Sequence, residues 1–219
     1  MAKTKISSRN MLFPELPVLV GTTVGGKPNY ITVGLVGWLC YDTVSVSLGH
    51  QQYSNAGIRE SRTFSINQPT VAMVKKLDYC GQHSGRHVDK SALFENFYGS
   101  LGTAPMIVEC PVNIECRVIQ TIERPVHTVF IGEISETYVD DSYMTGKEWD
   151  ISKMDPVLFS ALPVREGHFR GSYWRLGGYV APAWEVGKEL DGEMNPSLLR
   201  SVGEKEAKGL TQQDAQPDA

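Results

Sequence analysis

Pro17-Val-Leu-Val-Gly-Thr-Thr-Val24 is a run of apolar and β-branched residues that predicts a β-strand. Gly25-Gly26 follows it, and two such residues between strands are typical of a tight hairpin turn. The return strand is expected from about Asn29 to Leu39. Thr43-Val-Ser-Val-Ser-Leu48 then alternates apolar and polar residues, which is typical of a strand with one buried face. Together these segments predict an antiparallel sheet.

The rest of the chain continues this pattern, with a few short helices between the strands. Further strands are expected at Thr63–Asn67, Val112–Ile122 and Val126–Val139, and short strands or turns at Pro156–Phe159 and Ser172–Leu176. Helices are expected at Ser54–Ser61 with Ser54 as the N-cap, after Pro69-Thr70 with Val71, Val74 and Leu77 on successive turns, and at Asp89–Tyr98. The sequence has no G-x-G-x-x-G turn and no P-loop, which argues against a Rossmann or Walker nucleotide site. We therefore predict a mainly β fold with short helices, most simply an antiparallel barrel.

Composition narrows the class of protein further. The chain has 219 residues, 41% of them hydrophobic and 21% charged, which is ordinary for a globular protein. Its net charge of −4 argues against broad nucleic-acid binding. The longest apolar stretch, Ile31 to Cys40, is too short to span a membrane, and the basic N-terminus lacks the apolar segment of a signal peptide. We expect a cytoplasmic protein that binds neither membranes nor nucleic acid, with one domain over residues 1–202 and a disordered polar tail over 203–219. The four cysteines are expected to be free thiols.

The run from Asp78 to Lys90 is the strongest indication of a binding site. Ser84 can donate its hydroxyl hydrogen, Gly85 lets the backbone approach closely, and Arg86 and Lys90 supply positive charge. These are the groups that a phosphate or another anion favours. Tyr53-Ser-Asn55 is a second such stretch, because it opens a predicted helix whose N-terminus attracts anions.

Each of these features also has a simpler interpretation. Ser84 to Lys90 can be a solvated loop, and Ser54 and Asn55 can simply cap a helix. Cys80-x-x-His83-x-x-x-His87 has a spacing that would suit a metal, but the neighbouring cations disfavour one and we expect no metal site. The surroundings of Ser84 do not match the G-x-S-x-G turn of a hydrolase nucleophile.

Several stretches, in this order, resemble the flavin reductase-like proteins of the FMN-binding split-barrel fold, and among them the flavoredoxins. The matching stretches are Pro17–Gly21, Gly26–Thr32, Val44–Leu48, Tyr53–Asn55, Thr63–Asn67, Asp78–Gly81, Ser84–Arg86, Val88–Lys90 and His127–Glu133, and the resemblance covers about residues 11–180. The most specific of them are Ser84-Gly-Arg86 with Val88-Asp-Lys90, followed by His127-Thr-Val-Phe-Ile-Gly-Glu133. The sequence departs from the family at Cys80, where an aromatic residue is usual, and at Ser91, where Phe is common.

This resemblance implies a split β-barrel and a homodimer with one FMN per subunit near the dimer interface. It assigns the flavin ring to one group of strand residues, the phosphate to a second group of loop and helix residues, and a role near the nicotinamide to His127. The cofactor-binding residues so implied are Thr32, Val33, Gly34, Ser45, Ser47 and Leu48 for the ring, Ser54, Asn55, Ser84, Gly85, Arg86 and Lys90 for the phosphate, and also Asn67 and Cys80. Thr32 and Asn67 can equally be ordinary strand positions, and His127 can be an exposed hairpin residue.

The function implied by the resemblance is that of an FMN-dependent oxidoreductase. It would accept a hydride from NADH or NADPH at flavin N5 and pass electrons to free flavin, a redox-partner protein or oxygen. Two alternatives remain open at this point: a flavoredoxin-type electron carrier without a nicotinamide site, and a binding protein of the same fold without turnover. The four tryptophans, Trp38, Trp149, Trp174 and Trp184, are expected in the core or at an interface.

Overall fold

The computed structural model describes residues 2–3, 13–165, 168–183 and 185–186. The chain divides into two compact units, Met1–Leu176 and Gly177–Ala219. The α-helices and β-strands of the described residues all lie in the first unit. The predicted end of the domain, after residue 202, and the predicted tail lie outside the described residues.

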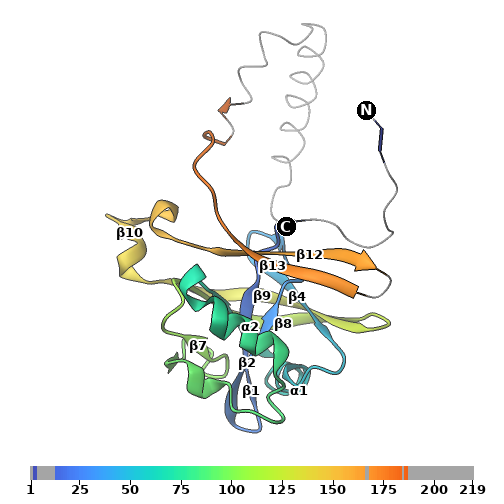
Figure 1. The fold of residues 1–219 in the computed structure, drawn as a ribbon. Helices are drawn as coiled ribbons and strands as arrows, with labels where there is room; N and C mark the ends of the chain where they lie inside the picture. Colours follow the sequence, from blue (N-terminus) through green and yellow to red (C-terminus); the bar gives the residue numbers. More distant parts are fainter. Residues whose placement is uncertain (1, 4–12, 166–167, 184, 187–219) are drawn as a thin grey trace, which may run out of the picture. The chain divides into compact units, whose positions relative to one another are not determined.

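The first unit is a β structure with two short α-helices (Figure 1). The strands are β1 Val18–Val24, β2 Lys27–Val33, β3 Val36–Cys40, β4 Thr43–Gly49, β5 Thr63–Gln68, β6 Asn96–Phe97, β7 Met106–Ile107, β8 Val112–Glu123, β9 His127–Val139, β10 Met144–Thr145, β11 Glu148–Trp149, β12 Val157–Arg165 and β13 His168–Arg175. The helices are α1 Ser54–Ser61 and α2 Val74–Gln82, with 3₁₀ turns at Val71–Met73, Ser91–Leu93, Asp141–Tyr143 and Ile151–Lys153. Neither α-helix in this part of the chain has the length and hydropathy needed to cross a membrane.

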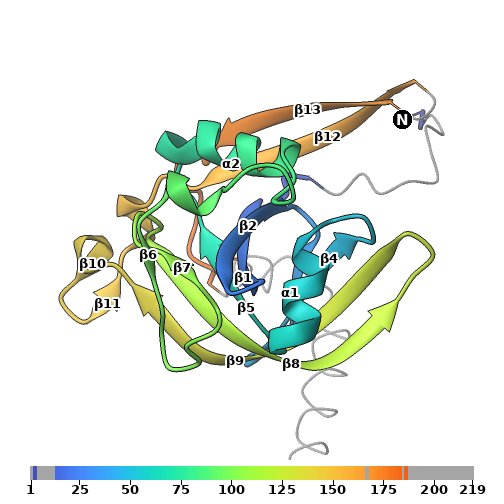
Figure 2. The same ribbon diagram turned by 90° about the horizontal axis from the view of Figure 1, so that it is seen from below.

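Seven strands form one antiparallel sheet in the order β2-β1-β5-β8-β9-β4-β3. Its two edges, β2 and β3, are separated in the chain by only Gly34 and Leu35. Two residues can join opposite edges only if the sheet curls back on itself, so the sheet forms a barrel (Figure 2). A backbone hydrogen bond from Ser47 to the carbonyl of Leu35, 3.0 Å long, holds this junction against β4.

Two apolar cores lie on the two faces of this sheet. The inner core fills the barrel with alternating residues from every long strand, for example Val20, Val46 and Phe130. The outer core lies between the sheet and α2, where Leu19 and Tyr30 meet Leu77. The β12–β13 hairpin covers the other side of α2 (Figure 2). Because both faces of β1 are covered, six of its seven residues are buried.

The structure corrects four details of the sequence prediction. The strand expected over Asn29–Leu39 is broken at Gly34–Leu35, because its two halves, β2 and β3, form the two opposite edges of the seven-stranded sheet. The helix expected at Asp89–Tyr98 is a 3₁₀ turn followed by β6, since the Asp89 carboxylate accepts hydrogen bonds from Ser91 N and Oγ in place of a helical bond pattern. The segments at Pro156–Phe159 and Ser172–Leu176 belong to one longer hairpin, β12–β13. Ser54 makes no capping hydrogen bond and is the first residue of α1.

The three tryptophans among the described residues are not in the core. Trp38 is 83% exposed, and Trp149 and Trp174 are more than half exposed, while Trp184 lies outside the described residues. The prediction of a core position is therefore wrong for these three, and an interface position remains a prediction.

Candidate functional site

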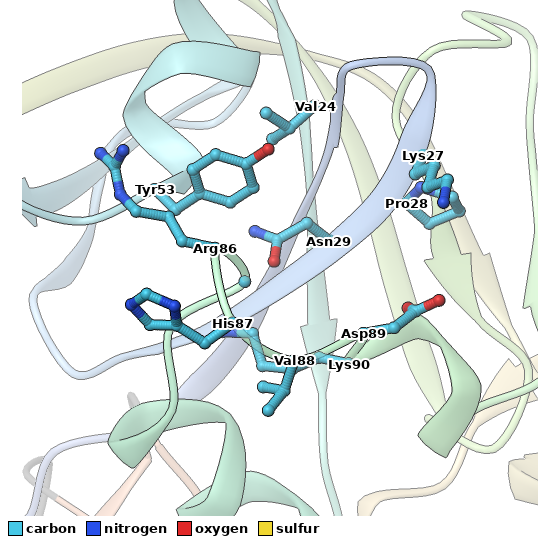
Figure 3. A pocket seen from close by; sticks show the side chains of 11 residues that line it. Val24, Lys27, Pro28, Asn29, Tyr53, Arg86, His87, Val88, Asp89 and Lys90 are labelled. Carbon is cyan, nitrogen blue, oxygen red and sulfur yellow. The ribbon is translucent and has the colours of Figure 1, made fainter.

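Two neighbouring cavities lie beside the segment that precedes α1 and the loop that follows α2. The first, here called the serine cavity, has a volume of about 180 Å³, and the second, the arginine cavity, about 250 Å³. The serine cavity is lined by Ile31, Gln51, Gln52, Tyr53, Ser54, Gly81, Gln82, His83, Ser84, Gly85 and Lys90. The arginine cavity is lined by Val24, Lys27, Pro28, Asn29, Tyr53, Gly85, Arg86, His87, Val88, Asp89 and Lys90 (Figure 3). The two cavities share Tyr53, Gly85 and Lys90, so these three residues form a wall between them.

Lys90 is the most unusual residue of this wall. Its side chain is only 2% exposed, and its ammonium donates to the carbonyls of Cys80, at 3.2 Å, and His83, at 2.9 Å. None of the ion pairs among the described residues includes Lys90. An ammonium has three N–H groups, so one of them remains free. Burial lowers the pKa of Lys90, because removing a charge from water disfavours it unless an anion compensates.

Ser84 and Gly85 shape the loop that follows α2. Ser84 Oγ accepts a hydrogen bond from the backbone N of Arg86 at 3.3 Å, and the Ser84 carbonyl accepts one from His87 N at 3.0 Å. A Cβ at Gly85 would lie 2.1 Å from Asn29 Oδ1, so only glycine fits this approach. The hydroxyl hydrogen of Ser84 has no acceptor among the described residues and is free to donate to a ligand in the serine cavity.

The N-terminus of α1 forms the opposite side of the serine cavity. Asn29 Nδ2 donates to Ser54 Oγ at 2.7 Å, which again leaves the Ser54 hydroxyl hydrogen available. The backbone N–H groups of Asn55 and Ala56 in the first turn of α1 already donate to the carbonyls of Gln52 and Tyr53, so the donor that this helix offers to the cavity is the Ser54 hydroxyl. Asn29 is a site residue that the sequence analysis missed, although an asparagine inside a strand is uncommon and was itself a usable signal.

The structure brings five of the six predicted phosphate residues to these cavities, but it divides them between the two. Ser54 and Ser84 line the serine cavity, Arg86 lines the arginine cavity, and Gly85 and Lys90 line both. The Arg86 guanidinium lies over the Tyr53 ring, 5.2 Å from its centroid, and no described carboxylate forms an ion pair with it.

Asn55 and His127 line neither cavity. Asn55 Nδ2 donates to the carbonyls of Gly49, at 2.7 Å, and Gln52, at 3.0 Å, while its Oδ1 is buried without a partner in the described structure. His127 is half-buried at the start of β9, opposite Gly49 in the β4–β9 register. Asn55 therefore fixes the loop between β4 and α1, and His127 stays a predicted nicotinamide-side residue.

The residues predicted to contact the flavin ring line neither cavity, and all but Gly34 lie on β2 or β4. Val33 and Leu48 are buried in the inner core, so they can offer only backbone groups to a ligand. Thr32 points toward α2, where its hydroxyl donates to the Leu77 carbonyl at 2.5 Å. The remaining three residues, Gly34, Ser45 and Ser47, are half-buried. Gly34 lies beside Glu15, and the two serines lie on the face of β4 opposite to the inner core. Contacts between these six residues and a flavin remain a prediction.

Two predicted cofactor residues have side chains that the fold itself uses. Asn67 is fully buried: its amide donates to Leu19 O and Ser65 Oγ and accepts from Ile107 N and Asn113 Nδ2, which completes its hydrogen bonds. The Cys80 thiol is buried in the outer core, and burial raises its pKa to about 11, partly offset by the nearby Lys90. Neither side chain is available to a ligand, so a contact of either residue with the cofactor stays a prediction that only backbone groups could fulfil. Cys80 contributes to the site only through the carbonyl that binds Lys90.

Comparisons with known proteins place the chain in a family and show which solved structures share its fold. Residues 10–160 match the family described as flavin reductase like domain. The structure is similar to that of flavoredoxin from Methanosarcina acetivorans, with 42% identity and a TM-score of 0.79 over 87% of this chain and 100% of that chain. It is also similar to flavoredoxin of Desulfovibrio vulgaris (Miyazaki F), with 34% identity and a TM-score of 0.75 over 85% and 100% of the two chains. The NADH:FAD oxidoreductase SgcE6 of Streptomyces globisporus shares the fold, with 20% identity and a TM-score of 0.57 over 72% and 86%. The predicted resemblance and the predicted mainly β split barrel are confirmed.

Proposed function

Because the chain belongs to the flavin reductase-like family, we propose that it is an FMN-binding oxidoreductase that accepts a hydride from NADH or NADPH. One observation carries the FMN assignment. The serine cavity contains a buried ammonium, that of Lys90, which has two neutral acceptors and no carboxylate partner among the described residues. A phosphate would supply the missing negative charge.

The donors around Lys90 fit a phosphate group. The hydroxyls of Ser54 and Ser84 line the same cavity, and each already accepts an internal hydrogen bond through its oxygen. Their hydrogens can therefore point to a phosphate oxygen. These residues would hold and orient the flavin phosphate, while α1 and the loop after α2 limit the access of water.

A bound flavin would supply a ring system that accepts two electrons, which hydride transfer from a nicotinamide provides. The contribution of the protein would be to position the two reactants and to stabilise the charge of the reduced ring with backbone donors from β2, which is an edge strand of the sheet. His127 is the first residue of β9 and lies opposite Gly49, the last residue of β4. It would influence the access of the nicotinamide, or the charge around it.

A second candidate function is that of an electron carrier without a nicotinamide site. The likeness to flavoredoxins at 42% and 34% identity favours it. The carrier would use the same phosphate residues and exchange electrons with a redox-partner protein. The two functions differ only in whether a nicotinamide reduces the bound flavin.

The decisive experiment is a titration of the flavin-free protein with FMN and with riboflavin, followed by anaerobic addition of NADH or NADPH. Tight FMN binding with much weaker riboflavin binding supports the phosphate site, because riboflavin lacks the phosphate. Bleaching of the flavin absorbance by a nicotinamide supports the reductase, whereas a flavin that stays oxidised supports the carrier. A protein that binds neither flavin would refute the proposal.

We also propose that the protein forms a homodimer through the exposed side of β3. This strand is an edge of the sheet, and it carries the exposed side chain of Trp38 beside Tyr41. An apolar cavity of about 290 Å³ lies next to them, lined in part by Val36 and Trp149. An unpaired edge rich in apolar groups favours association with a second copy about a twofold axis. Light scattering should give a dimer mass for the wild type and a monomer mass for a Trp38→Ser, Tyr41→Ser variant; a monomeric wild type would contradict this.

A further inference from the structure

The apolar cavity beside β3, here called the barrel-end cavity, has a volume of about 290 Å³ and is separate from the other two cavities. It shares no lining residue with the serine cavity or the arginine cavity. Val18, the first residue of β1, lines it, whereas Val24, the last residue of β1, lines the arginine cavity. The seven residues of β1 extend over roughly 20 Å, so the two cavities lie at opposite ends of this strand.

The walls of the barrel-end cavity are side chains of the inner core. Val18, Val44 and Ile66 belong to that buried cluster, and Val36 and Ile114 pack against it. Protein interiors are packed so closely that a void larger than a water molecule is uncommon. An apolar void of about 150 Å³ in another protein is already large enough to bind benzene. The inner core of this barrel therefore leaves room at one end for a molecule that contains a ring.

The chemistry of the lining selects the kind of molecule. None of the described residues that line the barrel-end cavity is charged. A charged group enclosed among apolar side chains would lose its hydration without gaining a partner. The cavity therefore suits a neutral molecule, in contrast to the phosphate proposed for the serine cavity.

Aromatic rings and two polar side chains complete the lining. Trp38, Tyr41 and Trp149 contribute ring surfaces against which another ring can stack. Gln68 and Thr137 also line the cavity, and their side chains make no hydrogen bond to another described residue. A largely apolar cavity with a few polar groups is the usual form of a small-molecule site. The amide of Gln68 and the hydroxyl of Thr137 are available to orient one polar substituent of a ring.

We propose that the barrel-end cavity binds a neutral aromatic molecule with a single ring and one hydrogen-bonding substituent. This site does not depend on the flavin, because none of the predicted cofactor-binding residues lines the cavity. The cavity lies beside β3, through which the homodimer is proposed to form. A side chain of a second copy is therefore the competing occupant.

The test measures binding of benzyl alcohol, and of benzoate as its charged analogue, to the flavin-free and to the FMN-saturated protein. Calorimetry gives the dissociation constant and the stoichiometry, and the flavin absorbance shows whether bound FMN is displaced. Two variants fill the cavity from different strands, Val36→Phe in β3 and Ile114→Phe in β8, so the test does not depend on either variant alone. Val108→Phe is the matched control, because Val108 is partly exposed and lines none of these three cavities.

Benzyl alcohol should bind the wild type once per chain with a dissociation constant below about 1 mM, and benzoate at least about tenfold more weakly. The affinity should be the same with and without FMN, and the flavin absorbance should not change. Val36→Phe and Ile114→Phe should each weaken binding about tenfold or more, while Val108→Phe stays within about twofold of the wild type. Benzyl alcohol should also raise the thermal unfolding midpoint of the wild type, but not that of the two filled variants.

The inference is overturned if benzyl alcohol does not bind, if it displaces FMN, or if the filled variants and the control bind it equally well. Binding only to the monomeric Trp38→Ser, Tyr41→Ser variant would also overturn it, since a second copy would then occupy the cavity in the wild type. All of these results leave the proposed function intact. Failure of the wild type to bind FMN would remove the proposed function, whereas binding of benzyl alcohol to the flavin-free protein would still be measured.

Discussion

Glu115 in β8 and Lys90 after α2 are both buried charged residues, but the fold surrounds them differently. Glu115 is 0% exposed and accepts four hydrogen bonds: from Ser100 N at 2.8 Å, Ser100 Oγ at 2.7 Å, Leu101 N at 3.0 Å and Tyr138 OH at 2.9 Å. Lys90 has two carbonyl acceptors and lines two cavities. A buried charge that the fold satisfies completely stabilises structure, whereas one left without a counter-charge beside a cavity indicates a ligand.

The largest expected effect concerns the Glu115 region. Glu115→Gln should lower the free energy of unfolding by about 2 to 3 kcal/mol. The reason is that the NH₂ group of the glutamine side chain would face N–H and O–H groups that donate hydrogen bonds to the carboxylate in the wild type. Urea unfolding monitored by tryptophan fluorescence measures this change. Tyr138→Phe, which removes a single donor, should cost only about 1 kcal/mol. An unchanged stability in Glu115→Gln, or a loss of FMN affinity, would break the contrast between the two regions.

The second-largest effect concerns Lys90, where a substitution should weaken FMN binding and leave the stability of the flavin-free protein unchanged. Lys90→Met should weaken FMN binding by about 2 kcal/mol, roughly 30-fold, because it removes a charge-assisted bond to the phosphate. Riboflavin affinity should stay within about twofold, and the flavin-free variant should unfold at no lower urea concentration, since no buried charge is left uncompensated. Lys75→Met is the matched control. Parallel losses for both flavins would show that Lys90 acts through the structure rather than on the phosphate.

A smaller effect is expected for one neutral donor to the same phosphate. Ser84→Ala should weaken FMN binding by about 1 kcal/mol, roughly fivefold, with riboflavin again unaffected. Fluorescence titration measures both ligands. Ser142→Ala is a suitable control, because Ser142 also belongs to an exposed local turn but lies outside both cavities. A Ser84→Ala variant with wild-type FMN affinity would remove Ser84 from the site.

Acid should distinguish the two regions as well. Burial raises the pKa of Glu115, but the hydrogen bonds from Ser100, Leu101 and Tyr138 outweigh it and hold the pKa below its ordinary value. The stabilisation is therefore complete above the pKa of the unfolded chain, about 4.3, and is lost as the pH falls through the lower folded value. Unfolding measured across this range should show a steeper loss in the wild type than in Glu115→Gln. Equal slopes would contradict this assignment.

Alkali should affect Lys90, and this is the smallest expected change. Burial lowers the pKa of Lys90, so its ammonium loses its proton at a lower pH than an exposed lysine does. The ratio of FMN affinity to riboflavin affinity should therefore fall a few-fold between about pH 7 and pH 9.5, where the phosphate stays a dianion. The ratio should be flat in Lys90→Met. A flat ratio in the wild type would exclude Lys90 from phosphate binding.

Most strands and both α-helices could be predicted because their signals are local. The alternation in Thr43–Leu48 and the spacing of Val71, Val74 and Leu77 each depend on neighbouring residues alone. The break at Gly34–Leu35 could not be predicted, since it depends on which strands form the two edges of the sheet. The same limit applies to Asn67, whose partners include Asn113 and Ile107, about forty residues away in the chain.

The sequence by itself determined the antiparallel hairpins and the concentration of hydroxyl and cationic groups between Ser84 and Lys90. Only the tertiary structure decided that Lys90 is buried without a carboxylate partner in the described residues, that Asn29 reaches Ser54, and that the predicted phosphate residues are divided between two cavities. The physical reason is that strand and turn propensities act over a few residues. Burial and charge compensation depend instead on segments that meet only when the barrel closes.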